Sequence, residues 1–380
     1  MIDIPKIQKA VVCTGPNQPW TVLTEYPVPH PGPYEVLIKV IAVGLCGGDG
    51  VLRSGGMPGL NYPMVAGHEV VGRIVALGSQ VHDESANDGS IWRWQAGKPS
   101  GMFDGWAWLY RCQVDATDLG YLCISGSDTA HATALTRDGG LAEYTIAHYT
   151  ALVPYPDNLP SIQAPLLCAG LTCFNALRHA HAKPGDSVLI IGCGGLGHVA
   201  IPLSRAMGLR PIVVSRSEAK REAALELGAE AFISSSTNDL VHEIARVVDT
   251  PFGGPGTGPG GVNVVLQTAP EEETLKRVAD ALAMDAEVFL LGEPESMRID
   301  LPLMPFLIKR ASIRGWTAGV PMDAHDTLRF CVQTGVRCVV RTTTLMGAED
   351  AYTDMGATRF RTVVVVDPEE TQKERDQGLA

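Results

Sequence analysis

Long apolar segments are missing from this chain of 380 residues. No run reaches the roughly 18 consecutive apolar residues that a membrane-spanning helix needs. The first residues, MIDIPKIQKAVVC, also lack the basic, then apolar, then small-residue order of a secretory signal. We therefore expect a cytoplasmic protein with no membrane segment.

Positive charge is scarce as well. Lys and Arg number 30 against 42 Asp and Glu, which gives a formal net charge of -12 and a pI near 5.3. Proteins that bind nucleic acids usually present a basic face to the phosphate backbone. The charge balance therefore favours a small-molecule substrate over a nucleic acid.

The nine cysteines are an odd number and lie at scattered positions. This usage fits a reducing compartment better than a disulfide framework, so a functional cysteine would be a metal ligand. With 45% hydrophobic and 19% charged residues the composition is that of a folded globular protein. The length suggests about two domains or three.

The chain shows two different sequence patterns. Residues 7–45 read as short alternating strands broken by Pro-rich turns, which predicts a β-rich domain. From about residue 170, apolar runs alternate with helical patterns, which predicts a parallel sheet. The expected strands there are 187–191, 211–215, 262–269 and 287–292, with a helix near 271–284. A late apolar run, FRTVVVVD at 360–367, is expected to return to the first domain.

Two segments look like insertions. Residues 82–110 hold four of the six tryptophans, and residues 251–261 are rich in Gly and Pro. The tryptophan-bearing segment is interpreted as apolar packing, with a contribution to the substrate pocket as the alternative.

A glycine-rich turn follows the run 187–191 and precedes a helical pattern. Glycines here permit a tight turn, let the backbone approach a pyrophosphate and allow close helix–strand packing, while the helix N-terminus favours the anion. With both flanks in place, the turn predicts a dinucleotide site rather than a purely structural turn. The residues expected to contact the dinucleotide are Gly192, Gly194, Gly195, Leu196 and Gly197.

The end of the next expected strand indicates which cofactor is used. A site for NAD usually offers Asp or Glu to the ribose hydroxyls there. This chain has Ser215, Arg216 and Ser217, with Lys220 close behind. A carboxylate would repel a 2′-phosphate, whereas hydroxyls and positive charge would bind it. The pattern favours NADP(H), although basic residues here also suit the solvated start of a helix.

Three separated segments carry residues that bind zinc. They are GLCGGD around Cys46, GHE around His68, and LCAG around Cys168. Two thiolates and an imidazole form a catalytic type of zinc set, with a fourth position open for water or a substrate oxygen. Each segment alone has a simpler explanation, because cysteines are often buried and a His after Gly can cap a turn. The prediction therefore depends on their occurrence together.

Over nearly its whole length the chain resembles the zinc-dependent medium-chain alcohol dehydrogenases. GLCGGD, AGHEVVG, DGGLAEY, PLLCAGLT and VLIIGCGGLGHVAI occur in that family's order and at its approximate distances. The GCGGLGH turn and the Ser-x-Ser-x-x-Lys arrangement are most similar to the cinnamyl alcohol dehydrogenase-like branch. The resemblance implies an α/β protein with a GroES-like catalytic domain (1–171 and 317–380) and a Rossmann domain (172–316), whose parallel sheet is doubly wound.

The resemblance also implies roles at the metal. One catalytic zinc per chain would be bound by Cys46, His68 and Cys168, with Glu69 able to approach it as an exchanging ligand. Asp49 would be the carboxylate that orients His68, a partner that metal-bound histidines commonly need.

For the cofactor, the resemblance implies that Thr172 faces the nicotinamide and that Arg361 binds the pyrophosphate. The expected reaction is hydride transfer between NADP(H) and an alcohol, aldehyde or ketone, with zinc polarising the oxygen. We expect a bulky apolar or aromatic substrate. Relatives pair edge strands of their cofactor domains, so a homodimer is expected too.

The chain departs from the family at the proton relay. The family usually has Ser or Thr two residues after the first ligand cysteine, where this chain has Gly48, and Val51 stands where relatives often keep a histidine. Proton delivery must then use water, a ribose hydroxyl or another side chain. An NADPH-dependent conjugate (ene) or imine reductase of the same fold remains the alternative.

A second departure concerns structural zinc. Relatives carry four cysteines in a lobe whose matching positions here are Leu109, Cys112, Asp115 and Cys123. A leucine cannot ligate, so we predict that the structural zinc is absent.

Two rival classes share this fold. Quinone or enoyl reductases need no zinc, and a set of Cys46, His68 and Cys168 with Asp49 counts against them. A non-enzymatic protein related to the zeta-type lens crystallins would require the zinc set to be residual.

Overall fold

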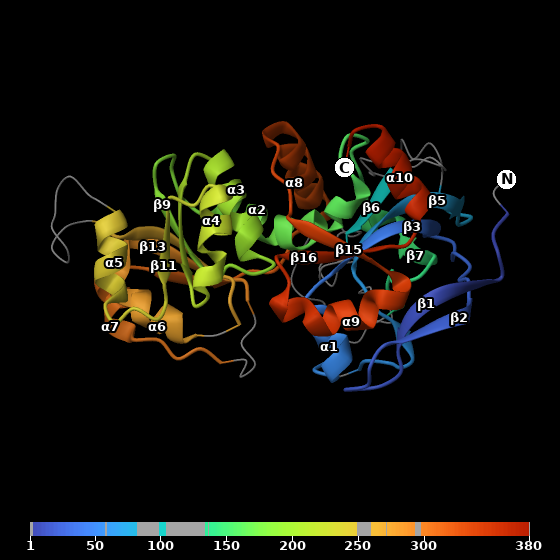
Figure 1. The fold of residues 1–380 in the computed structure, drawn as a ribbon, viewed down its shortest axis with the longest axis horizontal. Helices are drawn as coiled ribbons and strands as arrows, with labels where there is room; N and C mark the ends of the chain where they lie inside the picture. Colours follow the sequence, from blue (N-terminus) through green and yellow to red (C-terminus); the bar gives the residue numbers. More distant parts are fainter. Residues whose placement is uncertain are drawn as a thin grey trace. The chain divides into compact units, whose positions relative to one another are not determined.

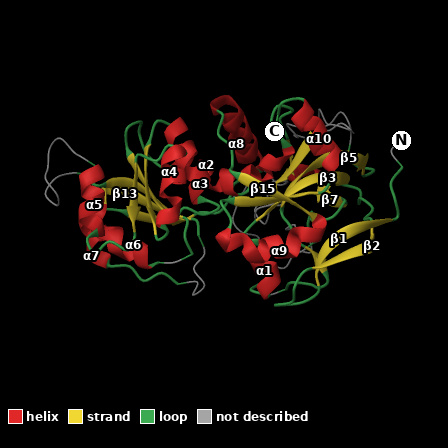
Figure 2. Cartoon of the chain, viewed as in Figure 1, coloured by secondary structure: helices red, strands yellow, loops and turns green. Residues whose placement is uncertain are grey.

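A computed structural model of the chain describes residues 3–57, 59–81, 99–103, 134–135, 137–248, 260–270, 272–292 and 298–379. It divides into two compact units. The first comprises Met1–Leu171 with Ala318–Ala380, and the second is Thr172–Thr317. Figure 1 traces the chain through them, and Figure 2 shows that both units contain helices and strands.

Two sheets form the first unit. A small antiparallel sheet has the order β2-β1-β4. A seven-stranded sheet has the order β15-β16-β3-β5-β6-β8, with β7 also paired to β3. The strands are β1 Ile7–Cys13, β2 Thr21–Pro27, β3 Glu35–Leu45, β4 Met64–Val65, β5 Glu69–Leu77, β6 Pro99–Phe103, β7 Tyr144–His148, β8 Leu152–Pro154, β15 Val340–Thr344 and β16 Arg361–Val365.

The core of the first unit lies around β3. This strand pairs antiparallel with β5, β7 and β16, and its apolar residues Val36–Ile38 and Val40–Val43 are buried. A strand that has neighbours on both edges and is buried on both faces has a nearly continuous apolar sequence. The pairing of β16 with β3 confirms that the late apolar run returns to the first domain.

Short helices surround these sheets. They are α1 Asp49–Ser54, α8 Pro321–Thr334, α9 Ala348–Thr353 and α10 Pro368–Asp376, with the 3₁₀ helices η3 Tyr149–Ala151, η4 Ser161–Leu167, η7 Leu345–Gly347 and η8 Asp354–Ala357. Helix α2, Ala169–His179, spans the boundary between the units.

The second unit is a six-stranded parallel sheet in the order β11-β10-β9-β12-β13-β14. Numbered from β9, this is the 3-2-1-4-5-6 order of a Rossmann fold. Its strands are β9 Ser187–Ile191, β10 Arg210–Ser215, β11 Ala231–Ser234, β12 Val262–Gln267, β13 Leu282–Leu290 and β14 Ser312–Gly315. Its helices are α3 Gly197–Ala206, α4 Arg221–Glu226, α5 Leu240–Val247, α6 Glu273–Val278 and α7 Leu303–Lys309, with η5 Glu218–Lys220 and η6 Ala279–Ala281.

The helix expected at 271–284 was predicted too long at its C-terminal end. Helix α6 and η6 end at Ala281, and β13 begins at Leu282. Leu282 and Ala283 are buried, and Leu282 lies opposite Val262 of β12. Sheet pairing therefore decides the structure of a short apolar stretch that periodicity alone leaves ambiguous.

Strand β13 contains Glu287–Leu290, the first four residues of the run EVFLLG, and lies inside the sheet, between β12 and β14. Most of the insertion at 82–110, the lobe that holds Cys112 and Cys123, and residues 251–259 lie outside the described residues. Within the described ranges, no helix combines the length and the apolar character needed to cross a membrane.

Candidate metal centre and dinucleotide site

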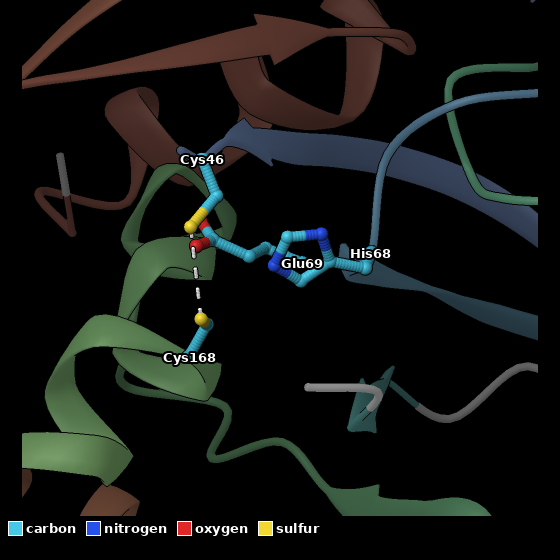
Figure 3. Close-up of side chains that lie close together, drawn as sticks. All are labelled: Cys46, His68, Glu69 and Cys168. Carbon is cyan, nitrogen blue, oxygen red and sulfur yellow. Dashed lines mark hydrogen bonds between the residues drawn. The ribbon is translucent and has the colours of Figure 1, made fainter. Parts of the chain in front are cut away.

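Four side chains of the first unit converge on one point (Figure 3). One ligand atom from each of Cys46, His68, Glu69 and Cys168 lies within 4.8 Å of every other. Segments far apart in the sequence thus supply two sulfurs, an imidazole and a carboxylate to a single site.

Strand pairing brings the first three together. Cys46 follows the last residue of β3, and His68 precedes the first residue of β5. Because these strands are antiparallel, with Gly44 opposite Glu69, the end of one meets the start of the other. Cys168 comes directly after η4.

A side chain in its first half anchors the 3₁₀ helix η4, and a local backbone bond closes its end. Gln163 donates from its amide to the carbonyl of Cys338 at 3.2 Å and accepts from the Cys338 N–H at 2.7 Å. The Cys168 N–H donates to the carbonyl of Pro165 at 3.3 Å. These bonds place the Cys168 thiol without a regular helix or strand.

Asp49 orients the imidazole. His68 Nδ1 lies 2.8 Å from Asp49 Oδ1, and the Cys46 N–H donates to Asp49 Oδ2 at 3.0 Å. Both side chains are buried. A carboxylate on Nδ1 leaves Nε2 as the nitrogen available to a metal. Burial lowers the pKa of His68, but the charges and hydrogen bonds of Asp49 and Cys46 together outweigh it and raise the pKa well above its usual value. The site therefore favours positive charge at the imidazole, which a metal ion at Nε2 would supply in place of a proton.

The two thiols share one hydrogen bond across 3.8 Å. That bond lowers the pKa of Cys46 well below its usual range although burial opposes ionisation, and Arg361 and His68 add positive charge. The same bond, burial and the charge on Cys46 raise the pKa of Cys168. A second thiolate therefore needs a cation placed between the two sulfurs.

Glu69 is fully buried and forms an ion pair with Arg361 of β16. Burial raises the pKa of Glu69 to about 7, against the lowering effect of the Arg361 charge. Its Oε2 and the Nε of Arg361 are buried polar atoms with no hydrogen-bond partner among the described residues. An orphaned carboxylate oxygen beside two thiols is a place that a cation would satisfy.

This donor set fits zinc. A tetrahedral zinc with Zn–S bonds of about 2.3 Å separates its two sulfurs by roughly 3.8 Å, which is the spacing between Cys46 and Cys168. Two cysteines and one histidine are also a known catalytic combination, in which a further position stays open.

Gly48 lies close to these donors. A Cβ at this position would lie 3.3 Å from His68 Cε1 and 3.8 Å from Cys46 Sγ. A side chain at position 48 would thus touch two of the proposed ligands, but glycine has no side chain to do so.

In the second unit, the glycine-rich turn connects β9 to α3. Gly192 has φ +97, and its N–H donates to the carbonyl of Val214 at 2.8 Å. A Cβ at Gly197 would overlap the carbonyl of Gly192, whereas one at Gly194 would meet nothing within 4 Å in the described part of the chain. Gly197 therefore lets helix and strand pack closely, and Gly194 leaves the backbone open to a ligand.

This turn lies at the carboxyl end of β9, where the strand order of the sheet reverses between β9 and β12. Ligands of doubly wound sheets bind at such a switch point. Thr268, from the end of β12, donates its hydroxyl to the carbonyls of Ile191 and Gly192. Leu196 and Gly195 belong to the same turn.

One of the basic residues after β10 already has partners within the protein. Arg221 pairs with Glu218, donates to the carbonyl of Phe232 and stacks on the Phe232 ring at 4.8 Å. Ser215 is buried at the end of β10, whereas Arg216 and Ser217 are exposed and Lys220 is partly exposed. Arg216 and Lys220 are the two other basic residues at this strand end.

Sequence reasoning missed two features of this centre. It assigned Arg361 to the pyrophosphate alone, while its guanidinium pairs with Glu69. It also overlooked Gly44, where a Cβ would overlap Glu69 Oε2. A glycine inside an apolar strand, as in VGLCG, is the signal that marks such a close approach. The cofactor roles of Thr172 and Arg361 stay predictions.

Comparison with known proteins confirms the expected fold and the resemblance. The alcohol dehydrogenase GroES-like domain matches residues 32–157, and the zinc-binding dehydrogenase family matches residues 195–333. By fold, the chain is similar to acetophenone reductase from Geotrichum candidum in complex with NAD, with a TM-score of 0.79 at 23% identity over 96% of this chain and 98% of that one.

Curated relatives are similar over most of their length. Alcohol dehydrogenase notN of an Aspergillus species is 32% identical over 96% of this chain and 100% of its own. NADP-dependent alcohol dehydrogenase C 1 of Mycolicibacterium smegmatis is 30% identical, covering 88% of this chain and 91% of its own. A probable cinnamyl alcohol dehydrogenase 2 of Picea abies is 30% identical, covering 86% and 85%.

The contact of Gly44 with Glu69 predicts the effect of one methyl group. Gly44→Ala places a Cβ on the buried carboxylate, so it should lower the free energy of unfolding by about 1–3 kcal/mol, as overpacking does. Urea unfolding measures this. Gly356→Ala is the control, because a Cβ there meets nothing within 4 Å in the described structure. Equal stability of the two variants would contradict the prediction.

Proposed function

We propose that this chain, which belongs to the zinc-dependent medium-chain alcohol dehydrogenase family, transfers hydride between NADP(H) and an alcohol, aldehyde or ketone. Family membership makes it an alcohol oxidoreductase. The observation that carries the finer proposal is the convergence of Cys46, His68, Glu69 and Cys168 on one buried point.

Cys46, His68 and Cys168 would hold one catalytic zinc per chain, with Glu69 as the exchanging fourth ligand. Zinc bound there supplies Lewis-acid stabilisation of the substrate oxygen. Asp49 keeps Nε2 of His68 directed at the site through its bond to Nδ1. Arg361 offsets the buried negative charge of Glu69 through their ion pair.

Proton transfer in this site would not use residue 48, because glycine has no hydroxyl. Water, or the ribose hydroxyl of the cofactor, would carry the proton instead. The missing hydroxyl at residue 48 also supports the alternative function, a conjugate (ene) or imine reductase. Such an enzyme does not need to protonate an alcohol oxygen in the usual way.

NADP(H) is proposed as the cofactor. Its pyrophosphate would lie on the turn of Gly192, Gly194, Gly195, Leu196 and Gly197, with Thr172 and Arg361 as further contacts. Its 2′-phosphate would be bound by the hydroxyls and cations that follow β10, and a relative described as NADP-dependent supports this choice. The cofactor supplies the hydride. These cofactor-selecting residues are Ser215, Arg216, Ser217 and Lys220.

The proposed substrate is bulky and apolar or aromatic. A relative described as a probable cinnamyl alcohol dehydrogenase supports this class. The cytoplasm is the proposed location, since nine cysteines at scattered positions fit a reducing compartment better than a disulfide framework.

A homodimer is proposed as the working form. Helix α7 exposes Leu303, Met304, Leu307 and Ile308 at 59–66%. The adjacent strand β14 lies at the edge of the parallel sheet and exposes Ile313. Four large apolar side chains on one short helix, next to an open strand edge, suit a two-fold contact with a second copy.

The zinc proposal predicts that Cys46→Ser loses the metal and the activity together. Plasma mass spectrometry should find about one zinc per chain in the wild type, as three protein ligands imply, and much less in the variant. NADPH oxidation with a panel of aldehydes should disappear with it. Zinc-free wild-type protein that still oxidises NADPH with conjugated enals would favour the ene-reductase alternative.

The cofactor proposal predicts a selective effect of Arg216→Ala. Loss of one charge-assisted contact should raise the KM for NADPH by about 10-fold, while the KM for NADH stays nearly constant. Steady-state kinetics with both cofactors measures the ratio. Arg246→Ala, which removes an exposed arginine of α5, is the charge-matched control. An equal change for both cofactors would show that Arg216 does not contact a 2′-phosphate.

The dimer proposal predicts that Leu307→Glu yields a monomer, because it places a charge in the centre of the apolar contact. Light scattering coupled to size-exclusion chromatography measures the mass. Leu225→Glu, on the exposed face of α4, should leave the dimer intact. A wild-type monomer, or a dimeric Leu307→Glu variant, would refute the proposal.

A further inference from the structure

The helix that carries Asp49 cannot support itself. Helix α1 has six residues, and no side chain caps its N-terminus. Helices this short are unstable in isolation, because one or two turns do not offset the cost of nucleation. Asp49 is its first residue, so whatever holds α1 also sets the position of the carboxylate that orients His68.

Helix α9 holds α1 at its C-terminal end (Figure 1). Arg53 donates two hydrogen bonds to the carboxylate of Glu349, at 2.7 and 2.8 Å. Glu349 also accepts from the N–H of Trp20 at 2.9 Å. A two-bond pairing of guanidinium and carboxylate restrains orientation as well as distance.

Tyr352, also on α9, holds the other end of α1. An ideal Cβ on Gly50 would lie 3.0 Å from the Tyr352 hydroxyl oxygen, closer than side chains normally approach. The phenol therefore occupies the space that a side chain at position 50 would need. Its ring packs on Trp20, 4.3 Å between centroids, and lies 5.2 Å below the guanidinium of Arg53.

The hydroxyl also lies in the electrostatic field of the metal centre. Burial raises the pKa of Tyr352, and the negative charges of Asp49 and Cys46 raise it further. A phenol in this place stays protonated and neutral, and it adds no charge to a site that already holds several anionic groups.

We propose that Tyr352 is a positioning residue of the metal centre: its hydroxyl, packed against Gly50, fixes the turn that carries Asp49 and so keeps His68 oriented as a ligand. This inference rests on the proposed zinc site. It assigns a role in metal binding to a residue that lies more than 300 positions away in the sequence from the turn it supports.

The contact predicts a specific coupling between positions 50 and 352. Gly50→Ala alone puts a methyl group against the hydroxyl and displaces the turn. In the Tyr352→Phe background the oxygen is gone, so the same methyl group fits. Alanine is also a better helix former than glycine, so a defect in Gly50→Ala cannot come from weaker helix propensity.

The experiment compares wild type, Tyr352→Phe, Gly50→Ala and the double variant. Each is loaded with Co²⁺ to record its thiolate charge-transfer and d–d absorption bands, and with Zn²⁺ to measure release to a coloured chelator. Tyr26→Phe is the matched control, because it removes a tyrosine hydroxyl that bonds to Asp138 elsewhere in the first unit.

Direct loss of an outer-shell partner weakens metal binding by about 10–100-fold. For Tyr352→Phe, which acts through Asp49, we expect zinc release to speed up by about 3–10-fold with shifted cobalt bands, by the same principle. Gly50→Ala should be affected at least as much, and the double variant should be no worse than Tyr352→Phe. Tyr26→Phe should match the wild type.

Two results would overturn the inference, and they are distinguishable. If the wild type takes up no Co²⁺ or Zn²⁺, the proposed function fails and this role fails with it. If the wild type binds metal but Tyr352→Phe keeps the wild-type bands and release rate, or Gly50→Ala has the same effect in both backgrounds, only the positioning role is wrong.

Discussion

The antiparallel pairing of β3 with β5 is the interaction on which the metal centre depends. It sets Gly44 opposite Glu69, and therefore brings Cys46, just past one strand, beside His68, just before the other. A register shifted by one residue would turn every side chain of β5 to the opposite face. The buried apolar residues of β3 secure this register. The packing of the core therefore also fixes the geometry of the site.

The charges at the site are stable only as a group. Glu69, Arg361, Asp49 and His68 are each less than a tenth exposed. Removing one such charge from its partners leaves the others buried and uncompensated, which is strongly unfavourable. The ion pair of Arg361 with Glu69 and the hydrogen bond of Asp49 with His68 each compensate two of these buried charges. The two thiols are left with a shared proton where a divalent cation would complete the balance.

Much of this arrangement could be read from the sequence because the signals are local. The turn Gly192–Gly197 has its strand before it and its helix after it, and the GHE and GLCGGD segments carry their ligand types side by side. The helix near 271–284 was misjudged at its end, since a short apolar stretch is compatible with helix or strand until a neighbouring strand pairs with it. Arg361 was predicted as a cofactor contact, and only the fold could reveal its ion pair with Glu69.

By itself the sequence determined the class of the two domains, the donor residues and the absence of a hydroxyl at Gly48, because these depend on residue type and spacing along the chain. The tertiary structure alone decided which donors meet, that Arg361 pairs with Glu69, and which distant side chain lies on Gly50. These contacts join segments separated by tens to hundreds of residues. They follow from strand register and helix packing, which no local pattern encodes.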